Sequence, residues 1–174
     1  MKLSILISIL FFTFTSFAAD KKKHVHREHG AHAHGTGNLA VAFDDTKGKI
    51  EFKGAAAGIL GFEHKSKNKK DEKAVADAVA HFENDISKMV QMDASLGCQF
   101  TKELIGQVPE EGSGEHSDWA ANFTVVCTKS PLGTKIVIDF SSFKFLKDLD
   151  ITVLAGSLQK SAEFKKSPVT VELQ

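Results

Sequence analysis

Hydrophobic and polar residues alternate along much of the chain, which is the pattern of half-buried β-strands. In residues 38–53 the apolar positions alternate as far as Phe43, a turn-forming Asp-Asp-Thr-Lys-Gly segment follows, and the alternation resumes at Ile50. This arrangement predicts a β-hairpin. Similar alternation predicts five more strands, at residues 96–104, 119–127, 136–140, 151–155 and 169–173.

One long segment has helical periodicity instead. Between Lys69 and Val90 the apolar residues recur every three or four positions and therefore share one face of a helix. A short second helix is predicted at Phe143–Leu149, and the Gly/Ala-rich residues 54–61 are expected to form a loop that can turn tightly. Strands joined by short turns and one main helix predict a single α+β domain with a mostly antiparallel sheet of about seven strands.

The first eighteen residues have the features of a secretory signal peptide. A single lysine, an apolar run to Phe14 and a cleavage pattern ending in Ala18 follow one another. A membrane anchor needs about 20 predominantly apolar residues, and this stretch is shorter and interrupted by Thr13 and Ser16. We therefore expect an exported protein that is not membrane-embedded after cleavage. Its expected parts are the signal peptide at 1–18, a His-rich metal-binding arm at 19–37 and the α+β domain at 38–174.

The charge balance gives no support for a nucleic-acid partner. The chain has 22 basic and 22 acidic residues, and loss of Lys2 with the signal peptide changes the formal net charge from zero to −1. Proteins that bind nucleic acid neutralise phosphates with a basic surface. We therefore predict no nucleic-acid binding.

The chain contains two cysteines, Cys98 and Cys127. In an exported protein an even number of cysteines favours a disulfide over a catalytic or redox-sensing role. Each cysteine also lies on the apolar face of a predicted strand, so both thiols are expected to face the core. The sequence lacks the Cys-x-x-Cys spacing typical of Cys/His metal sites. We predict a Cys98–Cys127 disulfide.

The histidines are distributed very unevenly. Five of the eight fall within eleven residues of the arm: His24, His26, His29, His32 and His34. In an extended segment, residues two positions apart project to the same side, so a His-x-His pair can bind one ion. Imidazole is a good ligand for Zn²⁺, and His-rich tracts are typical of metal-binding segments. The alternative is a solvated polar arm, but the density of histidine favours metal binding.

The other three histidines are less informative when each is taken alone. His64 precedes a lysine-rich run, which would repel a cation unless the lysines point outward. His116 lies close to Asp118 and offers a mixed nitrogen and oxygen site. His81 lies between two aspartates on the polar side of the predicted helix, as on an ordinary solvated face, and is left out of the candidate site.

Several motifs occur in an order that resembles a known family. They are His29-Gly30-Ala31-His32-Ala33-His34-Gly35, Gly61-Phe62-Glu63-His64, Gly97-Cys98, and Glu115-His116-Ser117-Asp118 ahead of a strand that ends in Cys127. In these motifs the mature chain resembles the ZrgA-type family of periplasmic zinc-uptake proteins. The resemblance implies a periplasmic zinc-binding protein that assists zinc uptake, with a zinc ABC importer or its binding protein as partner.

The resemblance also implies a set of metal ligands by position: His29, His32, His34, His64, His116 and Asp118. It leaves open whether Glu63 or Glu115 is a ligand as well. In the resulting hypothesis three histidines of the arm capture ions and pass them inward to a cluster of four. The capturing residues are His24, His26 and His29, and the cluster is His32, His34, His64 and His116. Many relatives carry a longer His- and Asp-rich insertion where this chain has only residues 108–114, so the resemblance does not extend to a second metal store in that loop.

Two other functions are compatible with a histidine cluster. A zinc hydrolase would need an open coordination position, but the chain has neither His-Glu-x-x-His nor His-x-His-x-Asp-His, so we predict no catalytic residues and no enzyme activity. Copper(I) is disfavoured because only two methionines remain in the mature chain. Nickel and copper(II) also bind imidazole and stay open as alternative metals.

Overall fold

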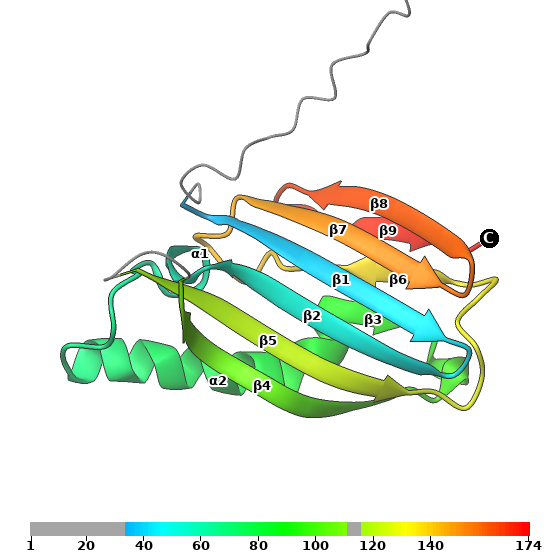
Figure 1. Cartoon of the computed structure of the whole chain (residues 1–174), viewed down its shortest axis with the longest axis horizontal. Coiled ribbons are helices and arrows are strands. Elements are labelled where there is room, and N and C mark those ends of the chain that lie inside the picture. Colours follow the sequence, from blue (N-terminus) through cyan, green and yellow to red (C-terminus); the bar gives the residue numbers. More distant parts are fainter. Residues whose placement is uncertain (1–33, 111–115) are drawn as a thin grey trace, which may run out of the picture. The chain divides into compact units, whose positions relative to one another are not determined.

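The computed structural model describes residues 34–110 and 116–174, and in this part of the chain nine strands form two sheets (Figure 1). The larger sheet has six strands in the order β4-β5-β2-β1-β7-β8. Neighbouring strands are antiparallel except β1 and β7, which are parallel. The bounds are β1 (Thr36–Asp44), β2 (Lys47–Ala55), β4 (Gln99–Pro109), β5 (Ser117–Val126), β7 (Asp148–Ala155) and β8 (Leu158–Phe164).

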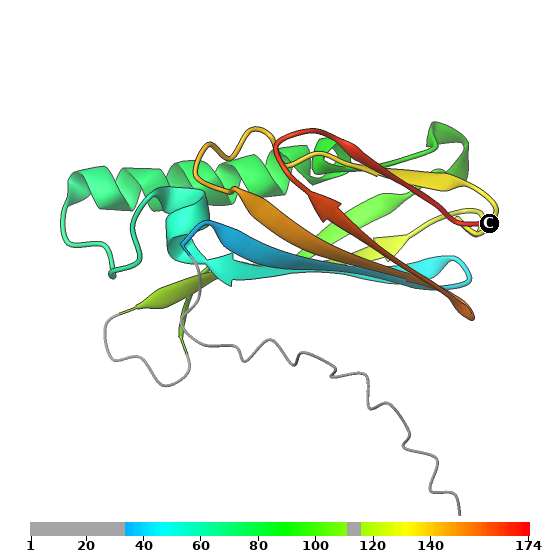
Figure 2. The same cartoon turned by 90° about the horizontal axis from the view of Figure 1, so that it is seen from above.

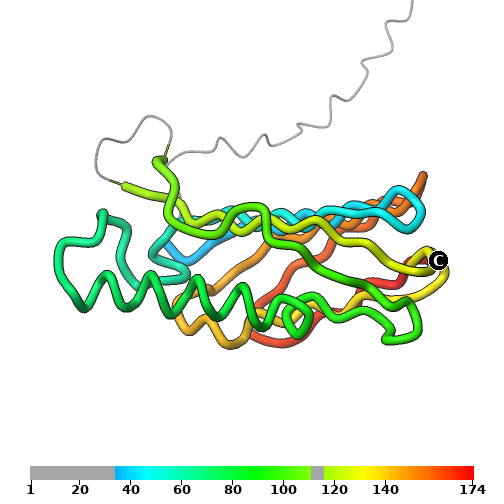
Figure 3. Tube along the Cα trace, turned by 90° about the horizontal axis from the view of Figure 1, so that it is seen from below, coloured from blue at the N-terminus to red at the C-terminus, as the bar shows by residue number. Residues whose placement is uncertain are grey.

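A second layer covers one face of this sheet. It consists of helix α2 (Lys69–Met89) and a small antiparallel sheet with the order β3-β6-β9. Figures 2 and 3 show α2 and the small sheet on the same side of the large sheet. The remaining elements are the short helix α1 (Ala56–Leu60), the 3-10 turn η1 (Ala94–Leu96), β3 (Val90–Met92), β6 (Lys135–Ile138) and β9 (Val169–Glu172).

The hydrophobic core lies between the two layers. As the alternation predicts, the inward-facing residues of β1 are buried: Leu39, Val41 and Phe43. Apolar residues on one face of α2 reach the same core, and the Phe82 ring lies 5.6 Å from Phe52 of β2 and 4.8 Å from Phe143, measured between ring centroids. Burial of these aromatic side chains, together with the other buried residues of α2, holds the helix on the sheet.

Helix α2 begins where its capping residue predicts. The side chain of Asn68 accepts hydrogen bonds from the backbone N–H groups of Lys70 and Asp71, which have no partner within the helix. Both the helix predicted between Lys69 and Val90 and the predicted α+β class are confirmed.

Three local predictions were wrong. Residues 143–149 form turns and the start of β7. The N–H groups of Phe143 and Leu146 each donate to the carbonyl three residues earlier, and both side chains are buried. The expected loop at 54–61 contains helix α1. Leu96 belongs to the η1 turn and not to a strand. Strands β3 and β8 were also missed, since β3 has three residues and β8 carries polar residues at most positions.

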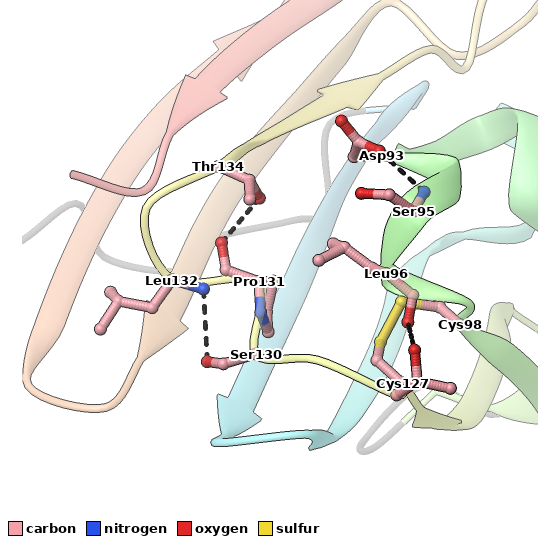
Figure 4. Close-up of a disulfide and its surroundings, with 10 residues drawn as sticks. Asp93, Ser95, Leu96, Cys98, Cys127, Ser130, Pro131, Leu132 and Thr134 are labelled. Carbon is pink, nitrogen blue, oxygen red and sulfur yellow. Dashed lines mark hydrogen bonds between the residues drawn. A yellow bond between two sulfur atoms is a disulfide. The ribbon is translucent and has the colours of Figure 1, made fainter.

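The predicted disulfide between Cys98 and Cys127 is confirmed (Figure 4). Cys98 precedes β4 and Cys127 follows β5, so the bond links the ends of two paired strands. Next to it, the carbonyl oxygen of Leu96 accepts hydrogen bonds from the backbone N–H and the hydroxyl of Thr128 (both 2.8 Å). A structural disulfide is typical of proteins in oxidising compartments outside the cytoplasm.

Neither helix of the described residues has the length and apolar character needed to cross a membrane.

Several strand ends meet at the edge of the sheet near α1 (Figure 1). The first residues of β1 and β7, Thr36 and Asp148, lie opposite each other. The last residue of β2, Ala55, pairs with Asp118 at the start of β5. The residues before β1, after β2 and before β5 are therefore brought together, although they are far apart in sequence.

The disulfide yields a test of stability. Replacing Cys98 and Cys127 together by serine is expected to lower the free energy of unfolding by about 3–4 kcal/mol. The two cysteines are 29 positions apart, and without the bond the unfolded chain gains the conformational entropy of the opened loop. Urea unfolding of the variant and the wild type under oxidising conditions measures the difference. Wild-type protein unfolded with a reductant is the control and should match the variant; equal stability of variant and oxidised wild type would contradict the prediction.

Candidate metal centre

Glu63 joins two histidines at the sheet edge near α1. Its Oε1 lies 2.7 Å from the Nδ1 of His34, and its Oε2 lies 2.6 Å from the Nδ1 of His116. The three residues are separated by 29 and 53 positions in sequence. The structure therefore assembles two imidazoles and one carboxylate from three segments.

The three side chains differ in their exposure to solvent. Glu63 is 12% exposed, whereas His34 and His116 are 73% and 55% exposed. A carboxylate with so little contact with water requires hydrogen-bond or charged partners, and the two imidazoles meet this need. The imidazoles themselves remain accessible to an ion from solvent.

The turn after α1 places Glu63. Helix α1 is capped by the residue that follows it, Gly61, which has a left-handed backbone (φ 82°) and donates its N–H to the carbonyl of Ala57 (3.0 Å). A side chain at this position would meet the Phe145 ring, because a Cβ would lie 2.8 Å from it. Glycine is thus required on two grounds, and it reverses the chain so that Glu63 turns toward the start of β1.

Two side chains from β4 and β5 hold the backbone of this turn. The Ser117 hydroxyl donates to the carbonyl of Glu63 (2.5 Å), and the Gln107 amide donates to the carbonyl of His64 (3.1 Å) and to the Ser117 hydroxyl (2.9 Å). Ser117, the residue after His116, therefore holds Glu63, which His116 contacts. This network lowers the freedom of Glu63 before any ion binds.

A second glycine places His34. Gly35 also has a left-handed backbone (φ 88°), and its carbonyl accepts from the N–H groups of Lys147 (2.7 Å) and Asp148 (3.2 Å). These hydrogen bonds hold Gly35, the residue after His34, against the start of β7. In His34-Gly35 a histidine that can bind metal is thus followed by a glycine, whose backbone adopts the left-handed conformation that directs the chain here.

His64 has a different partner. Its Nε2 lies 3.2 Å from Oδ2 of Asp71 in the first turn of α2, and its ring packs against Phe62 with 4.8 Å between ring centroids. The backbone N–H of Lys67 holds the pKa of Asp71 below its ordinary value; the hydrogen bond from His64 also lowers this pKa, while burial opposes the shift. Asp71 is therefore a stable anion beside His64.

Asp118, the remaining carboxylate of the predicted ligand set, is 2% exposed and pairs with Lys53. The distance from Lys53 Nζ to Asp118 Oδ2 is 3.3 Å, close enough for an ion pair, although within the described residues this oxygen is not aligned for a hydrogen bond. The structure thus shows Asp118 as a buried partner of a lysine.

The structure brings some of the predicted site residues together. His34 and His116 meet through Glu63, while His64 and Asp118 contact other partners. Glu63 was left open by the sequence, and its place in a motif with His64 was the only signal that pointed to it. The other predicted residues of the arm lie outside the described residues: His24, His26, His29 and His32.

His81 links α2 to the turn after β6. Its Nδ1 lies 2.9 Å from Asp85 and its Nε2 lies 2.8 Å from the Ser142 hydroxyl. Its ring also packs against Phe143. Both ring nitrogens are thus engaged by side chains of the domain.

A group of carboxylates lies on β7 and β8. Asp148, Asp150 and Glu163 offer oxygen atoms within 4.8 Å of one another. Burial raises the pKa of Asp148, and the nearby charge of Glu163 raises it further. Glu163 also pairs with Lys165 (2.9 Å). The repulsion among these carboxylates is therefore relieved in part by a lysine of this chain, and we do not assign the group as a metal site.

Comparison with known proteins identifies the family. The family model described as "ZrgA family zinc uptake protein" matches residues 31–173, and the chain belongs to this family. The matched region contains Glu63 and both histidines that it contacts. None of the curated proteins compared with the chain matches it.

Two effects make glycine necessary at position 61: the left-handed backbone and the close contact with the Phe145 ring. Gly133 has a similar backbone (φ 85°) but nothing within 4 Å of an added Cβ, so Gly133→Ala should cost about 1–2 kcal/mol of stability for the left-handed backbone alone. Gly61→Ala should cost more and should also weaken zinc binding, because the Phe145 ring must move. Chemical unfolding and zinc titration of both variants test this; equal effects would contradict it.

The acidic group yields a pH-dependent prediction. A raised native pKa means that ionisation of Asp148 opposes folding, so Asp148→Asn should raise the free energy of unfolding at pH 7. The gain should vanish as the pH falls below the ordinary value of 3.8, where both states are protonated. Urea unfolding at pH 7 and pH 3 measures it.

Asp93 supplies the control of opposite sign. Hydrogen bonds from the side chain and backbone of Ser95 lower its pKa, so Asp93→Asn should reduce stability at pH 7 and have less effect at pH 3. If Asp148→Asn destabilised the protein at pH 7 in the same way, the predicted effect of the raised Asp148 pKa would be contradicted.

Proposed function

We propose that this member of the ZrgA zinc-uptake family captures zinc in the periplasm at a centre built on His34, Glu63 and His116, and delivers it to an uptake system. The observation that carries the proposal is the Glu63 carboxylate, which contacts an imidazole with each of its oxygens. Neutral imidazoles and a carboxylate are ligands that Zn²⁺ prefers. The family match supports zinc as the metal.

An ionised carboxylate can only accept hydrogen bonds, so without an ion each imidazole donates from Nδ1 to Glu63. For one ion to be held by all three side chains, the two Nδ1 protons would have to be released to solvent, and contacts to the metal would then replace the contacts among the side chains. Because ligands must be deprotonated, acidification should release the ion.

The predicted arm would supply the remaining ligands. Four histidines of the arm precede His34: His24, His26, His29 and His32. A segment with many imidazoles can exchange one ligand for another without emptying the coordination shell, which favours capture and transfer over permanent storage. His32, two residues before His34, is the nearest of these histidines in sequence.

The periplasmic location rests on two features. Residues 1–18 have the pattern of a cleaved signal peptide, and the Cys98–Cys127 disulfide fits an oxidising compartment. A zinc ABC importer or its binding protein is the expected recipient. The function is binding and transfer without catalysis, in keeping with the family description.

Glu63→Gln tests the centre directly. The mature wild-type protein should bind zinc with micromolar or tighter affinity, which corresponds to about −8 kcal/mol or more favourable binding. The substitution keeps the size of the side chain but removes its charge, and it should weaken zinc binding about 10- to 100-fold. Competition with a chromophoric chelator measures both affinities, and nickel and copper(II) in the same assay test the alternative metals.

His81→Ala is the matched control, since His81 is a histidine of the same domain that already has two partners. It should leave the zinc affinity unchanged. Wild-type binding weaker than micromolar would contradict the proposed function. If Glu63→Gln and His81→Ala had equal affinities, the ion would bind elsewhere.

A further inference from the structure

His64 is held on several sides within the domain. Gln107 donates to its backbone carbonyl, Phe62 packs against its ring, and Asp71 accepts from its Nε2. The side chain nevertheless remains 37% exposed. An imidazole fixed in this way has lost most of its conformational freedom and is still reachable from solvent.

The environment of Asp71 determines which nitrogen of His64 carries the proton. Asp71 is buried, and its Oδ2 accepts from the Lys67 backbone N–H (3.1 Å), the Asn68 side-chain amide (3.0 Å) and His64. The first two groups can only donate, so this oxygen acts as an acceptor throughout. His64 must then donate from Nε2, and a neutral ring keeps its lone pair at Nδ1.

We propose that Asp71 is a positioning residue that presents the Nδ1 of His64 to zinc as a further ligand beside the Glu63 centre. Carboxylate groups that hydrogen-bond the distal nitrogen of a metal-binding histidine fix its orientation and increase its basicity. The inference rests on the proposed function and extends it, because it assigns the binding atom of His64 and gives Asp71 a role beyond α2.

A role in the helix alone is the competing explanation. Asp71 lies in the first turn of α2, where Asn68 caps the helix, and carboxylates are favourable at this position. A cap needs no histidine partner, however. The two roles therefore differ in one measurable respect: only the positioning role couples Asp71 to His64 in zinc binding.

A double-mutant cycle measures this coupling. Zinc affinities of the mature protein are determined for the wild type, Asp71→Asn, His64→Ala and the double variant. Asp71→Asn should weaken binding about 10- to 100-fold when His64 is present and change it less than about twofold when His64 is absent. Equal effects of Asp71→Asn in both backgrounds would overturn the proposal.

Asp85→Asn is the matched control. Asp85 lies on the same helix and pairs with His81 at 2.9 Å, so the substitution breaks an equivalent aspartate–histidine contact away from Glu63. Its zinc affinity should equal that of the wild type. A loss as large as that of Asp71→Asn would mean that disturbing α2 is sufficient, and would overturn the proposal.

Nitrogen-15 NMR of the wild-type protein tests the same idea without a substitution. Before zinc is added, His64 should be protonated at Nε2, and zinc should shift the resonance of Nδ1 while the Nε2 proton is retained. Zinc at Nε2, or no change in the His64 ring on zinc binding, would overturn the inference. In either case the response to Glu63→Gln still decides the proposed function separately.

Discussion

The hydrogen bonds between the Glu63 carboxylate and two imidazoles join three distant segments of the chain at the sheet edge near α1. A carboxylate that is nearly removed from water is stable only if other groups replace its hydration. His34 and His116 do so here, and neither lies near Glu63 in sequence. The left-handed backbone at Gly61 and the Ser117 hydroxyl both serve to bring this carboxylate to its partners.

The sheet topology supplies the geometry for this contact. Strands β1, β2 and β5 are neighbours, so the start of β1, the end of β2 and the start of β5 all reach one edge. The parallel pairing of β1 with β7 adds the amides of Lys147 and Asp148, which hold Gly35. The two imidazoles thus lie at the ends of hydrogen-bonded strands. The strands hold their backbone while the rings stay exposed to solvent.

Two aspartates of α2 each contact a histidine, and the surroundings of each pair decide what the contact does. The His81 pair is completed by Ser142 and packs against Phe143, so both of its ring nitrogens act inside the domain. The His64 pair involves one ring nitrogen and lies next to Glu63 in the chain. An aspartate–histidine contact therefore supports packing at His81, whereas at His64 it leaves one ring nitrogen that could bind a metal.

The fold class, the long helix and the disulfide could all be predicted from the sequence, because alternation and helical spacing are local signals of burial and an even number of cysteines in an exported protein favours pairing. The sequence also identified His34 and His116 as candidate ligands. Local signals failed at residues 143–149, where the predicted helix would have placed Phe145 and Leu149 on one buried face but Phe145 is exposed, and in the polar strand β8. That Glu63 contacts both of these histidines, while Asp118 pairs with Lys53 and His64 with Asp71, could be seen only in three dimensions, because strand pairing decides which distant side chains meet.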